Sequence, residues 1–447
     1  MKIKTISRSE VDHTRDCKRD LQKVHRNLDP KLHPFEKARE YTRALNATKL
    51  DKVFAKPFVG ALDGHMDGVN CVAASPTSLS AFLSGSCDGE IRLWDLSHRR
   101  TVWSVFGHTG HVRGLAVMPS GEAFFSCGDD GTVKQWGLGV AAAGDTDEPE
   151  PLAVYNCPGS LLNIDHHWSQ TKFVTAGDCL NLWDHTRSAP IKSYSWGSDT
   201  VTCARFNPAE TSLVVSAGSD RALTLYDIRQ EKPLHKLVMA MRSNSVCWNP
   251  MEAFNFTVAN EDFNLYTFDM RKFARPMMVH KDHVGAVMDV SYSPTGREFV
   301  SGSYDRTVRI WEVNKGNSRE IYHTKRMQRV WAVRYTANAK FVVSGSDDAI
   351  VRVWKAQASK SLAKLDPRAQ RKMNYLGKLK ERYKDVPDLK RIAKHRQQPK
   401  YILKAREEAA TIKAAKKVKA SNRRKHSAPG MHLDEEERVK PIIKELD

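Results

Sequence analysis

The sequence predicts an all-β fold, a propeller of seven four-stranded blades, flanked by two arms that lack a strand pattern. Three observations lead to this prediction. A segment ending in an aromatic residue recurs seven times along the 447 residues, its spacing stays close to 43 residues, and apolar and polar side chains alternate within it. Repeats of this length are typical of units that each build one blade of a closed ring.

Each repeat runs from small residues through an Asp to a strand with an aromatic end, as in SGSYDRTVRIW at residues 301–311. Val308 and Ile310 share one face of that strand and Arg309 takes the other, as expected for period-2 structure. The spacings between the aromatic positions are 42, 47, 43, 42, 43 and 43 residues. These positions are Trp94, Trp136, Trp183, Tyr226, Phe268, Trp311 and Trp354. The aromatic-Asp ending at this period marks a WD-repeat propeller.

An Asp stands six residues before the aromatic residue in six of the units. The third unit is one residue short, with Asp178 five residues before Trp183, which predicts an irregular blade. Recurrence at one structural position favours a role in a tight turn over metal or acid–base chemistry. The resemblance to WD repeats implies three buried hydrogen-bonded networks. They are His65, Ser84, Asp88 and Trp94; His108, Ser126, Asp130 and Trp136; and His283, Ser301, Asp305 and Trp311.

The ring must close, because an open ring leaves an unpaired edge strand. Residues 58–62 (FVGAL) fit the outer strand of the last blade, so that the N-terminal segment holds the C-terminal repeat. The long 47-residue spacing contains VAAAGDTDEPEP (residues 140–151), for which we predict a protruding acidic loop between blades two and three.

The formal charge of +19 is unevenly distributed. Residues 1–60 hold 15 basic and 8 acidic side chains, residues 61–354 hold 29 and 32, and residues 355–447 hold 27 and 12. A nearly neutral centre therefore lies between two basic arms. Such a concentration favours binding of the arms to a polyanion over a merely solvated surface.

The predicted boundaries are 1–57 for the N-terminal arm, 58–355 for the propeller and 356–447 for a helical C-terminal domain. A helix is expected from Pro34 through Leu50, and three more at about 368–384, 387–397 and 399–420. The final stretch, residues 434–447, predicts a short docking segment. A basic cluster indicates nuclear import, RNA binding or both, against the alternative of a solvated helix face. It consists of Lys413, Lys416, Lys417, Lys419, Arg423, Arg424 and Lys425.

Several functional classes are disfavoured by the sequence. No run approaches 18 apolar residues, so we expect no membrane span, and the first 20 residues lack the apolar stretch of a secretory signal, so we expect an intracellular protein. The eight cysteines are scattered, without CxxC spacing, and are interpreted as thiols rather than zinc ligands. No P-loop, nucleophile elbow or HExxH motif occurs, so we expect no enzyme, cofactor, metal site or small-molecule substrate.

Both arms resemble one family closely. The blocks RNLDPKLHPFEKAREYTRALNATKLDKVFAKPF, LKERYKDVPDLKRIAKHRQQPKYI and NRRKHSAPG are similar to those of the Sof (suppressor of fibrillarin) type of WD-repeat protein. The resemblance implies a non-catalytic scaffold in ribosome biogenesis, located in the nucleus and nucleolus. It would belong to the small-subunit processome, which includes a box C/D small nucleolar RNP, and would be needed to process the precursor of small-subunit ribosomal RNA. The implied partners are pre-ribosomal or small nucleolar RNA and other processome proteins.

A second function also rests on particular residues. The adjacent repeats end in Tyr226-Asp227-Ile228-Arg229 and Phe268-Asp269-Met270-Arg271, which resemble the WDxR box except at the aromatic position. WD proteins with this box dock on the adaptor of cullin-RING ubiquitin ligases as substrate receptors. The alternative is that Arg229 and Arg271 only pair with neighbouring acids. The receptor and scaffold roles can coexist on different faces of one ring.

Overall fold

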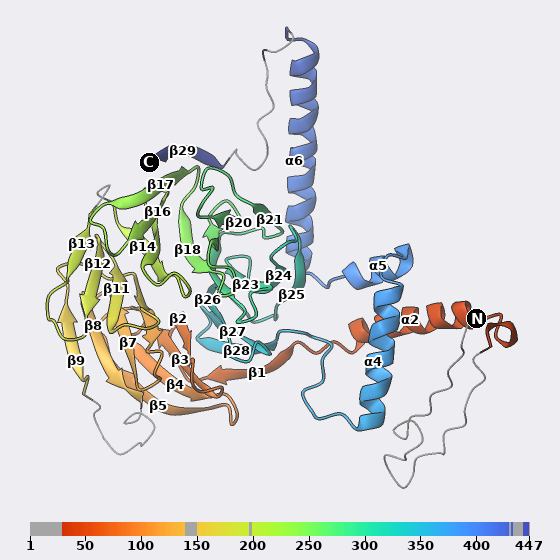
Figure 1. The fold of residues 1–447 in the computed structure, drawn as a ribbon, viewed down its shortest axis with the longest axis horizontal. Coiled ribbons are helices and arrows are strands. Elements are labelled where there is room, and N and C mark those ends of the chain that lie inside the picture. The colour runs from red at the N-terminus through yellow and green to blue at the C-terminus, as the bar shows by residue number, and fades with distance from the viewer. Residues whose placement is uncertain (1–28, 139–149, 196–198, 429–430, 432–440, 447) are drawn as a thin grey trace, which may run out of the picture. The chain divides into compact units, whose positions relative to one another are not determined.

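The computed structural model describes residues 29–138, 150–195, 199–428, 431 and 441–446. Within these residues, seven antiparallel sheets follow one another along the chain, and Figure 1 shows them arranged as the blades of a ring. The predicted seven-bladed propeller is confirmed. None of the helices in the described ranges combines the length and apolar character that crossing a bilayer requires.

The first four blades each run from an innermost strand at the centre of the ring to an outer strand. Blade one contains β2 (Val69–Ala74), β3 (Ala81–Ser86), β4 (Glu90–Asp95) and β5 (Arg100–Phe106). Blade two contains β6 (Val112–Val117), β7 (Ala123–Gly128), β8 (Thr132–Gly137) and β9 (Ala153–Asn156). Blade three contains β10 (Asn163–His166), β11 (Lys172–Ala176), β12 (Leu180–Asp184) and β13 (Lys192–Tyr194). Blade four contains β14 (Val201–Phe206), β15 (Leu213–Gly218), β16 (Ala222–Asp227) and β17 (Pro233–Met239).

The remaining three blades follow the same order. Blade five contains β18 (Ser243–Trp248), β19 (Asn255–Asn260), β20 (Asn264–Asp269) and β21 (Met278–Lys281). Blade six contains β22 (Val287–Tyr292), β23 (Glu298–Ser303), β24 (Val308–Glu312) and β25 (Ser318–Tyr322). Blade seven contains β26 (Val330–Tyr335), β27 (Phe341–Ser346), β28 (Ile350–Lys355) and β1 (Phe58–Asp63).

Pairing of β1 with β28 closes the ring. Phe58 lies opposite Trp354, and Leu62 lies opposite Val351. The predicted outer strand at residues 58–62 is confirmed, and the innermost strand of each blade contacts that of the next, including β26 with β2. Since the first strand of the chain completes the last blade, opening the ring would require breaking this sheet.

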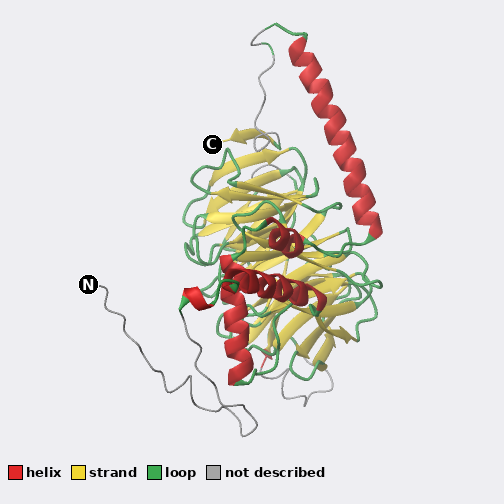
Figure 2. Ribbon diagram, turned by 90° about the vertical axis from the view of Figure 1, so that its right-hand side faces the viewer, coloured by secondary structure: helices red, strands yellow, loops and turns green. Residues whose placement is uncertain are grey.

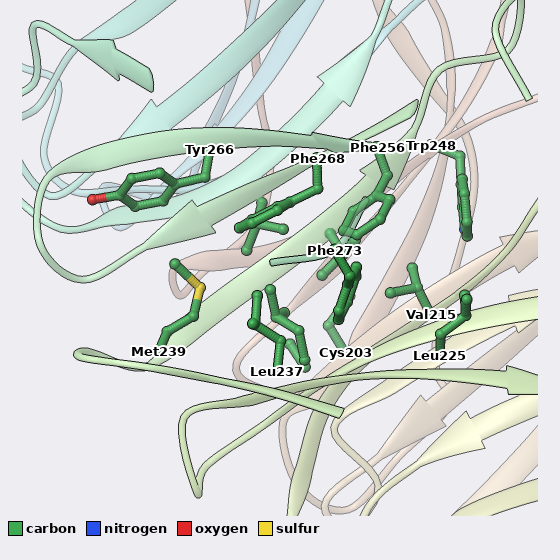
Figure 3. Close-up of a cluster of buried hydrophobic side chains, with 14 residues drawn as sticks. Cys203, Val215, Leu225, Leu237, Met239, Trp248, Phe256, Tyr266, Phe268 and Phe273 are labelled. Atoms are coloured by element: carbon green, nitrogen blue, oxygen red, sulfur yellow. The ribbon is translucent and has the colours of Figure 1, made fainter. Parts of the chain in front are cut away.

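The hydrophobic core lies between neighbouring blades. Figure 3 shows the cluster that joins blades four and five, in which Val215 and Leu237 pack with Phe256, Phe268 and Phe273. The rings of Phe256 and Phe268 stack with their centroids 5.7 Å apart. Full burial of such a side chain contributes about 1.5–3 kcal/mol, so the blade interfaces are a main source of stability.

Packing on both sides also buries the polar face of some strands. In β24, Val308 and Ile310 occupy one face and Arg309 the other, as predicted, and all three are 0% exposed. Arg309 is therefore a buried charge that needs an acidic partner.

The Asp-containing turns between second and third strands use left-handed backbone in the blades other than blade three. The angle φ is +88° at Gly89, +73° at Gly131 and +58° at Arg306. The Asp305 carboxylate Oδ1 accepts the backbone N–H of Thr307 at 3.0 Å, which stabilises the turn. This is the turn role predicted for the repeated Asp.

Two sequence predictions concern blades two and three. The acidic loop was predicted between these blades, and this is wrong: residues 138–152 connect β8 to β9, which belong to the same sheet. Residues 139–149 of that loop lie outside the described residues. Blade three, for which we predicted an irregular structure, has short strands, with four residues in β10 and three in β13, but its pairing shows no shift of register.

Blade four has a fifth strand that comes from the end of the chain. Strand β29 (Ile442–Leu446) pairs antiparallel with the outer strand β17, with Ile442 opposite Met239 and Leu446 opposite Lys236. The Ala240 N–H donates to Pro441 O at 2.7 Å. The predicted docking segment at residues 434–447 thus ends by extending a sheet, while residues 432–440 lie outside the described residues.

Four α-helices and one short 3₁₀ helix occur in the described ranges. They are η1 (Pro30–Leu32), α2 (Glu36–Val53), α4 (Pro367–Arg382), α5 (Pro387–Lys394) and α6 (Lys400–Lys425). They agree with the four predicted helices, although α6 runs five residues further than expected. Figure 2 shows α6 as a single unbroken helix and the strands gathered in the ring.

Helices α2, α4 and α5 form a compact unit that contains residues 29–56 and 357–395. Its small core consists of Ala44, Leu379 and Leu389. The Tyr41 hydroxyl donates to Asp388 Oδ2 at 2.9 Å across the helices. The N-terminal arm therefore folds with the first part of the C-terminal domain, and α6 belongs to the same compact unit as the propeller.

Candidate nucleic-acid and adaptor interfaces

The repeat network of blade two is present as the sequence implied. His108 Nδ1 lies 3.0 Å from Asp130 Oδ2, and its Nε2 lies 2.8 Å from Ser126 Oγ. The Trp136 indole donates to the same Ser126 hydroxyl at 2.9 Å. Burial lowers the pKa of His108, so the imidazole is neutral at physiological pH and acts as a hydrogen-bonding group.

Blade six contains the same arrangement in a more buried form. His283 Nδ1 lies 2.8 Å from Asp305 Oδ2, and His283 Nε2 and the Trp311 indole both bond to Ser301 Oγ, at 2.7 and 2.8 Å. Burial raises the pKa of Asp305, but the charge and hydrogen bond of His283 lower it further, so it lies well below its usual range.

Blade one departs from the implied network. His65 Nε2 and the Trp94 indole bond to Ser84 Oγ at 2.6 and 2.7 Å, but His65 Nδ1 faces Glu90 Oε2 at 3.0 Å. Asp88 does not contact the imidazole; it accepts the Glu90 N–H at 3.0 Å. Placing Asp88 in this network was therefore wrong, because the longer Glu90 side chain reaches His65 from the next strand.

The imidazole of His65 and the two neighbouring carboxylates lie close enough together to suggest a cation site. His65, Asp88 and Glu90 place ligand atoms within 4.8 Å of one another. Glu90 is already paired with Arg92 at 2.7 Å as well as with His65. The carboxylate charge is thereby balanced by protein groups, and we assign the cluster a structural role.

Blade five carries a network that sequence reasoning missed. Thr257 and Thr267 hydroxyls lie 2.9 Å apart across β19 and β20, and Thr257 also meets the Tyr292 hydroxyl at 2.6 Å. His280 Nε2 lies 3.1 Å from Thr267 Oγ1, and its Nδ1 donates to Lys315 O at 2.8 Å. The sequence could have indicated this network, because Phe268 stands where other repeats have Trp. Without the indole donor, threonines form the hydrogen bonds at the inner polar positions.

The start of α6 is fixed to blade six by charged contacts. The carboxylate of Asp282, whose side chain is 3% exposed, lies 3.6 Å from Arg396, 3.4 Å from Arg406 and 3.7 Å from Arg309. The N–H and hydroxyl of Ser318 both donate to Asp282 Oδ2 at 2.8 Å. Burial lowers the pKa of both Arg309 and Arg396, and the charge of Asp282 opposes this shift in each, together with Asp305 for Arg309.

Two further contacts complete this attachment. The Tyr401 hydroxyl donates to the backbone oxygen of Asp305. Ile402 is 0% exposed. The Tyr401 hydroxyl thus holds the first turn of α6 at the Asp305 turn, and the same helix turn buries the Ile402 side chain.

The predicted basic cluster lies on the exposed remainder of α6. All seven of its side chains, from Lys413 to Lys425, are exposed. At a rise of 1.5 Å per residue the cluster extends over about 18 Å. No acidic residue occurs between residues 409 and 425, so this stretch carries a concentrated positive charge. The sequence interpretation of a strongly basic helix therefore agrees with the structure.

The two predicted adaptor boxes end β16 and β20, at equivalent positions of adjacent blades. Asp227 accepts the N–H of Arg229 at 3.0 Å. Asp269 accepts the N–H of Arg271 and also pairs with its guanidinium, at 3.0 Å each. The hydrogen bond from Arg271 lowers the pKa of Asp269.

The two arginines nevertheless face solvent. Arg271 keeps 61% of its side chain exposed while its guanidinium lies 4.3 Å from the centre of the Phe254 ring. Arg229 is also exposed. The pairing with a neighbouring acid is present for Arg271, and it orients this side chain without burying it.

The cysteines of the described residues are free thiols. They are Cys71, Cys87, Cys127, Cys157, Cys179, Cys203 and Cys247. Burial raises the pKa of Cys87 and Cys157 to about 11. These two thiols therefore stay protonated at neutral pH, which disfavours nucleophilic or metal chemistry. Cys17 lies outside the described residues.

Comparison with known proteins agrees with this division of the chain. Residues 356–442 match the Sof1-like domain, and residues 56–95, 99–137, 274–312 and 319–355 match the WD domain, G-beta repeat. DDB1- and CUL4-associated factor 13 of Xenopus laevis is 51% identical over 443 residues, 99% of each chain. The chain belongs to this family of Sof1-type WD-repeat proteins.

Relatives with the same name occur in distant organisms. The protein of Mus musculus is 50% identical over 445 residues, 99% of each chain, and that of Dictyostelium discoideum is 48% identical over 423 residues, 94% of this chain and 95% of the relative. By name, these relatives associate with DDB1 and CUL4. The resemblance to the Sof type is thereby confirmed over nearly the whole length of the chain.

Proposed function

We propose that this chain is a non-catalytic scaffold of ribosome biogenesis, a nucleolar component of the small-subunit processome that binds pre-ribosomal or small nucleolar RNA through α6. The observation that carries the proposal is the exposed basic cluster on a helix whose start is anchored to blade six. The Sof1-like domain covers this helix. The protein acts by binding, with the ring for protein contacts and α6 for RNA.

The physical basis is release of counterions from RNA. Each phosphate that a Lys or Arg neutralises steepens the salt dependence of binding by about 0.7 in a log–log plot for single strands. The anchored end of α6 keeps the cluster in a defined position, because Asp282 holds both Arg396 and Arg406. We therefore expect RNA affinity that falls steeply with salt.

The test removes positive charge from α6 in one variant and from the unit formed by α2, α4 and α5 in another. One variant changes Lys413, Lys416, Lys417 and Lys419 to Gln. The matched control changes four exposed lysines of the other helical unit, Lys372, Lys378, Lys384 and Lys390, to Gln. The α6 variant should no longer co-sediment with large pre-ribosomal particles in a sucrose gradient, should lose RNA crosslinks in cells and should impair precursor-RNA processing. The control variant should retain co-sedimentation, crosslinks and processing. Equal losses in both variants, or none in the first, would show the proposal to be wrong.

A second function is favoured by the exposed boxes of blades four and five. We propose that Arg229 and Arg271 dock the ring on DDB1, so that the chain is also a substrate receptor of a cullin-RING ubiquitin ligase. The support is the equivalent placement of two exposed arginines on adjacent blades together with the names of the relatives.

Charge reversal tests this docking. Arg229→Glu combined with Arg271→Glu should abolish recovery of DDB1 in a pull-down and leave precursor-RNA processing unchanged. The control is Arg187→Glu, an exposed arginine between β12 and β13 of blade three, where the spacing to Asp184 is one residue too long for the box. Persistent DDB1 recovery in the double variant would reject the box assignment.

A further inference from the structure

An aromatic pair lies where blade six meets blade seven. Tyr304, in the turn between β23 and β24, is 36% exposed. Its ring meets the half-buried Trp331 of β26 edge-on, with centroids 5.4 Å apart. The Arg329 guanidinium lies 4.8 Å from the centre of the Tyr304 ring, and the Trp331 indole donates to Asp347 Oδ1 at 3.3 Å. Two aromatic rings and one guanidinium plane are thus held together on an accessible surface.

The propeller fold itself does not require aromatic residues at these positions. The residue before the turn Asp is Tyr304 in blade six, and in the other regular blades it is Cys87, Asp129, Ser219, Glu261 or Asp347. The counterpart of Trp331 is Asn70, Arg113, Thr202, Asn244 or Met288. Non-aromatic residues therefore satisfy the fold, and among these regular blades the aromatic pair occurs at one junction.

That junction is also where α6 attaches. Tyr401, in the first turn of α6, donates its hydroxyl to the backbone oxygen of Asp305. Asp305 lies between Tyr304 and Arg306 in the same turn, so the aromatic pair is next to the start of the basic helix. Arg306 and Arg329 add positive charge to this junction, whereas Arg406 is paired with Asp282. The Asp347 carboxylate accepts the indole N–H.

We propose that Tyr304, Trp331 and Arg329 form a stacking platform for unpaired bases of single-stranded RNA that continues along α6. Unpaired bases stack on aromatic rings and guanidinium planes, whereas bases within a duplex are not available for such stacking. Arg306 and the basic face of α6 take the phosphates on either side. This inference rests on the proposed RNA-binding function and adds the kind of RNA and the side chains that hold its bases.

The charge around the pair favours RNA over a protein segment. Arg329 lies over the Tyr304 ring, Arg306 follows in the same turn, and the basic helix starts at that turn. A polyanion matches this charge, whereas a neutral peptide gains nothing from it and a basic one is repelled. The fixed orientation of the Trp331 indole, held by Asp347, lowers the entropy lost when a base stacks on it.

The test measures binding of the full chain to two labelled RNAs of equal length, an oligoadenylate and a duplex hairpin. Tyr304→Ala combined with Trp331→Ala should weaken oligoadenylate binding about tenfold or more and leave duplex binding unchanged. Tyr304→Phe combined with Trp331→Phe should retain most of the single-strand affinity, because rings still stack. Trp168→Ala, which removes another Trp that is 57% exposed, is the control.

The possible results separate the platform from the RNA-binding function as a whole. Loss of oligoadenylate binding in the Ala variant but not the Phe variant, with an unchanged melting temperature, supports the platform. Unchanged oligoadenylate affinity in the Ala variant overturns the platform, and so does an equal loss of affinity in the Phe variant. If the α6 Gln variant then still loses both RNAs, the proposed function stands without the platform. Failure of the unaltered chain to bind either RNA rejects both.

Discussion

Arg396 Nη1 lies 3.6 Å from Asp282 Oδ2, and this contact holds the segment that precedes α6 on the sixth blade of the propeller. Asp282 also pairs with Arg309 of β24, which is 0% exposed. One buried carboxylate therefore has two tasks: it compensates a charge inside the blade and it attaches the segment that leads to α6.

We expect Asp282→Asn to destabilise the protein and to release α6. Removing one partner of a buried ion pair costs about 3–5 kcal/mol, because the other charge is left uncompensated. Urea unfolding should show this loss. Hydrogen exchange should show faster exchange at residues 396–406, and unchanged protection there would contradict the anchoring role.

The matched control for this change is Glu312→Gln. Glu312 pairs with Lys315 at 2.5 Å, but the Lys315 side chain is 65% exposed. Exposed pairs contribute about 0–1 kcal/mol, so stability should hardly change.

The sequence could predict the ring because every blade repeats the same local pattern. The period, the Asp turn and the alternation in β24 each depend on residues within one unit, and the closing strand β1 carries its own apolar pattern. The helices of the arms were also predictable, since Pro387 begins α5 and the apolar positions recur at helical spacing.

Contacts between distant segments carried no comparable signal. The core of Ala44, Leu379 and Leu389 joins residues more than 300 positions apart, and no local pattern indicates such a partner. The choice of Glu90 over Asp88 beside His65 depends on which of two nearby carboxylates reaches the imidazole across the blade. The pairing of β29 with β17 likewise depends on a register that the sequence does not display.

The blade-one network leads to a prediction about its two acids. We expect Glu90→Ala to cost about 2–3 kcal/mol, because His65 and Arg92 both lose a buried charged partner. Asp88→Ala should cost about 1 kcal/mol, since only the bond to a backbone N–H is lost. Urea unfolding of both variants gives the comparison. A larger cost for Asp88→Ala would restore Asp88 as the partner of His65.

Buried histidines make the stability of the propeller sensitive to acid. Burial lowers the pKa of His280 and of His166 to about 4, whereas an unfolded histidine has a pKa of about 6.5. Above pH about 6.5 these histidines are neutral in both the folded and the unfolded chain, so the full free energy of unfolding is present. Between pH about 6.5 and about 4 only the unfolded chain is protonated, and the free energy of unfolding falls.

The expected loss in the free energy of unfolding is on the order of 3 kcal/mol per histidine over that interval. Melting temperatures measured across it should fall with decreasing pH, and His280→Gln should flatten the dependence. His98→Gln, which replaces a histidine whose side chain is 69% exposed, is the control. If the melting temperature depends on pH in the same way with and without His280, this histidine is not a source of the acid sensitivity.

The fifth strand of blade four can be tested by two substitutions at neighbouring positions. Ile442 packs against the cluster that contains Leu237 and Met239, whereas Ile443 is 59% exposed. We expect Ile442→Ala to lower stability by about 1–2 kcal/mol, because it removes partly buried apolar surface. Ile443→Ala should change stability by less than about 0.5 kcal/mol. Hydrogen exchange should show that Ile442→Ala speeds exchange of β17 amides while those of β16 remain protected, since only β17 forms the edge that β29 covers. Equal effects of the two substitutions would mean that β29 is held by its backbone alone, and unchanged exchange in β17 would mean that this strand does not cover the edge in solution.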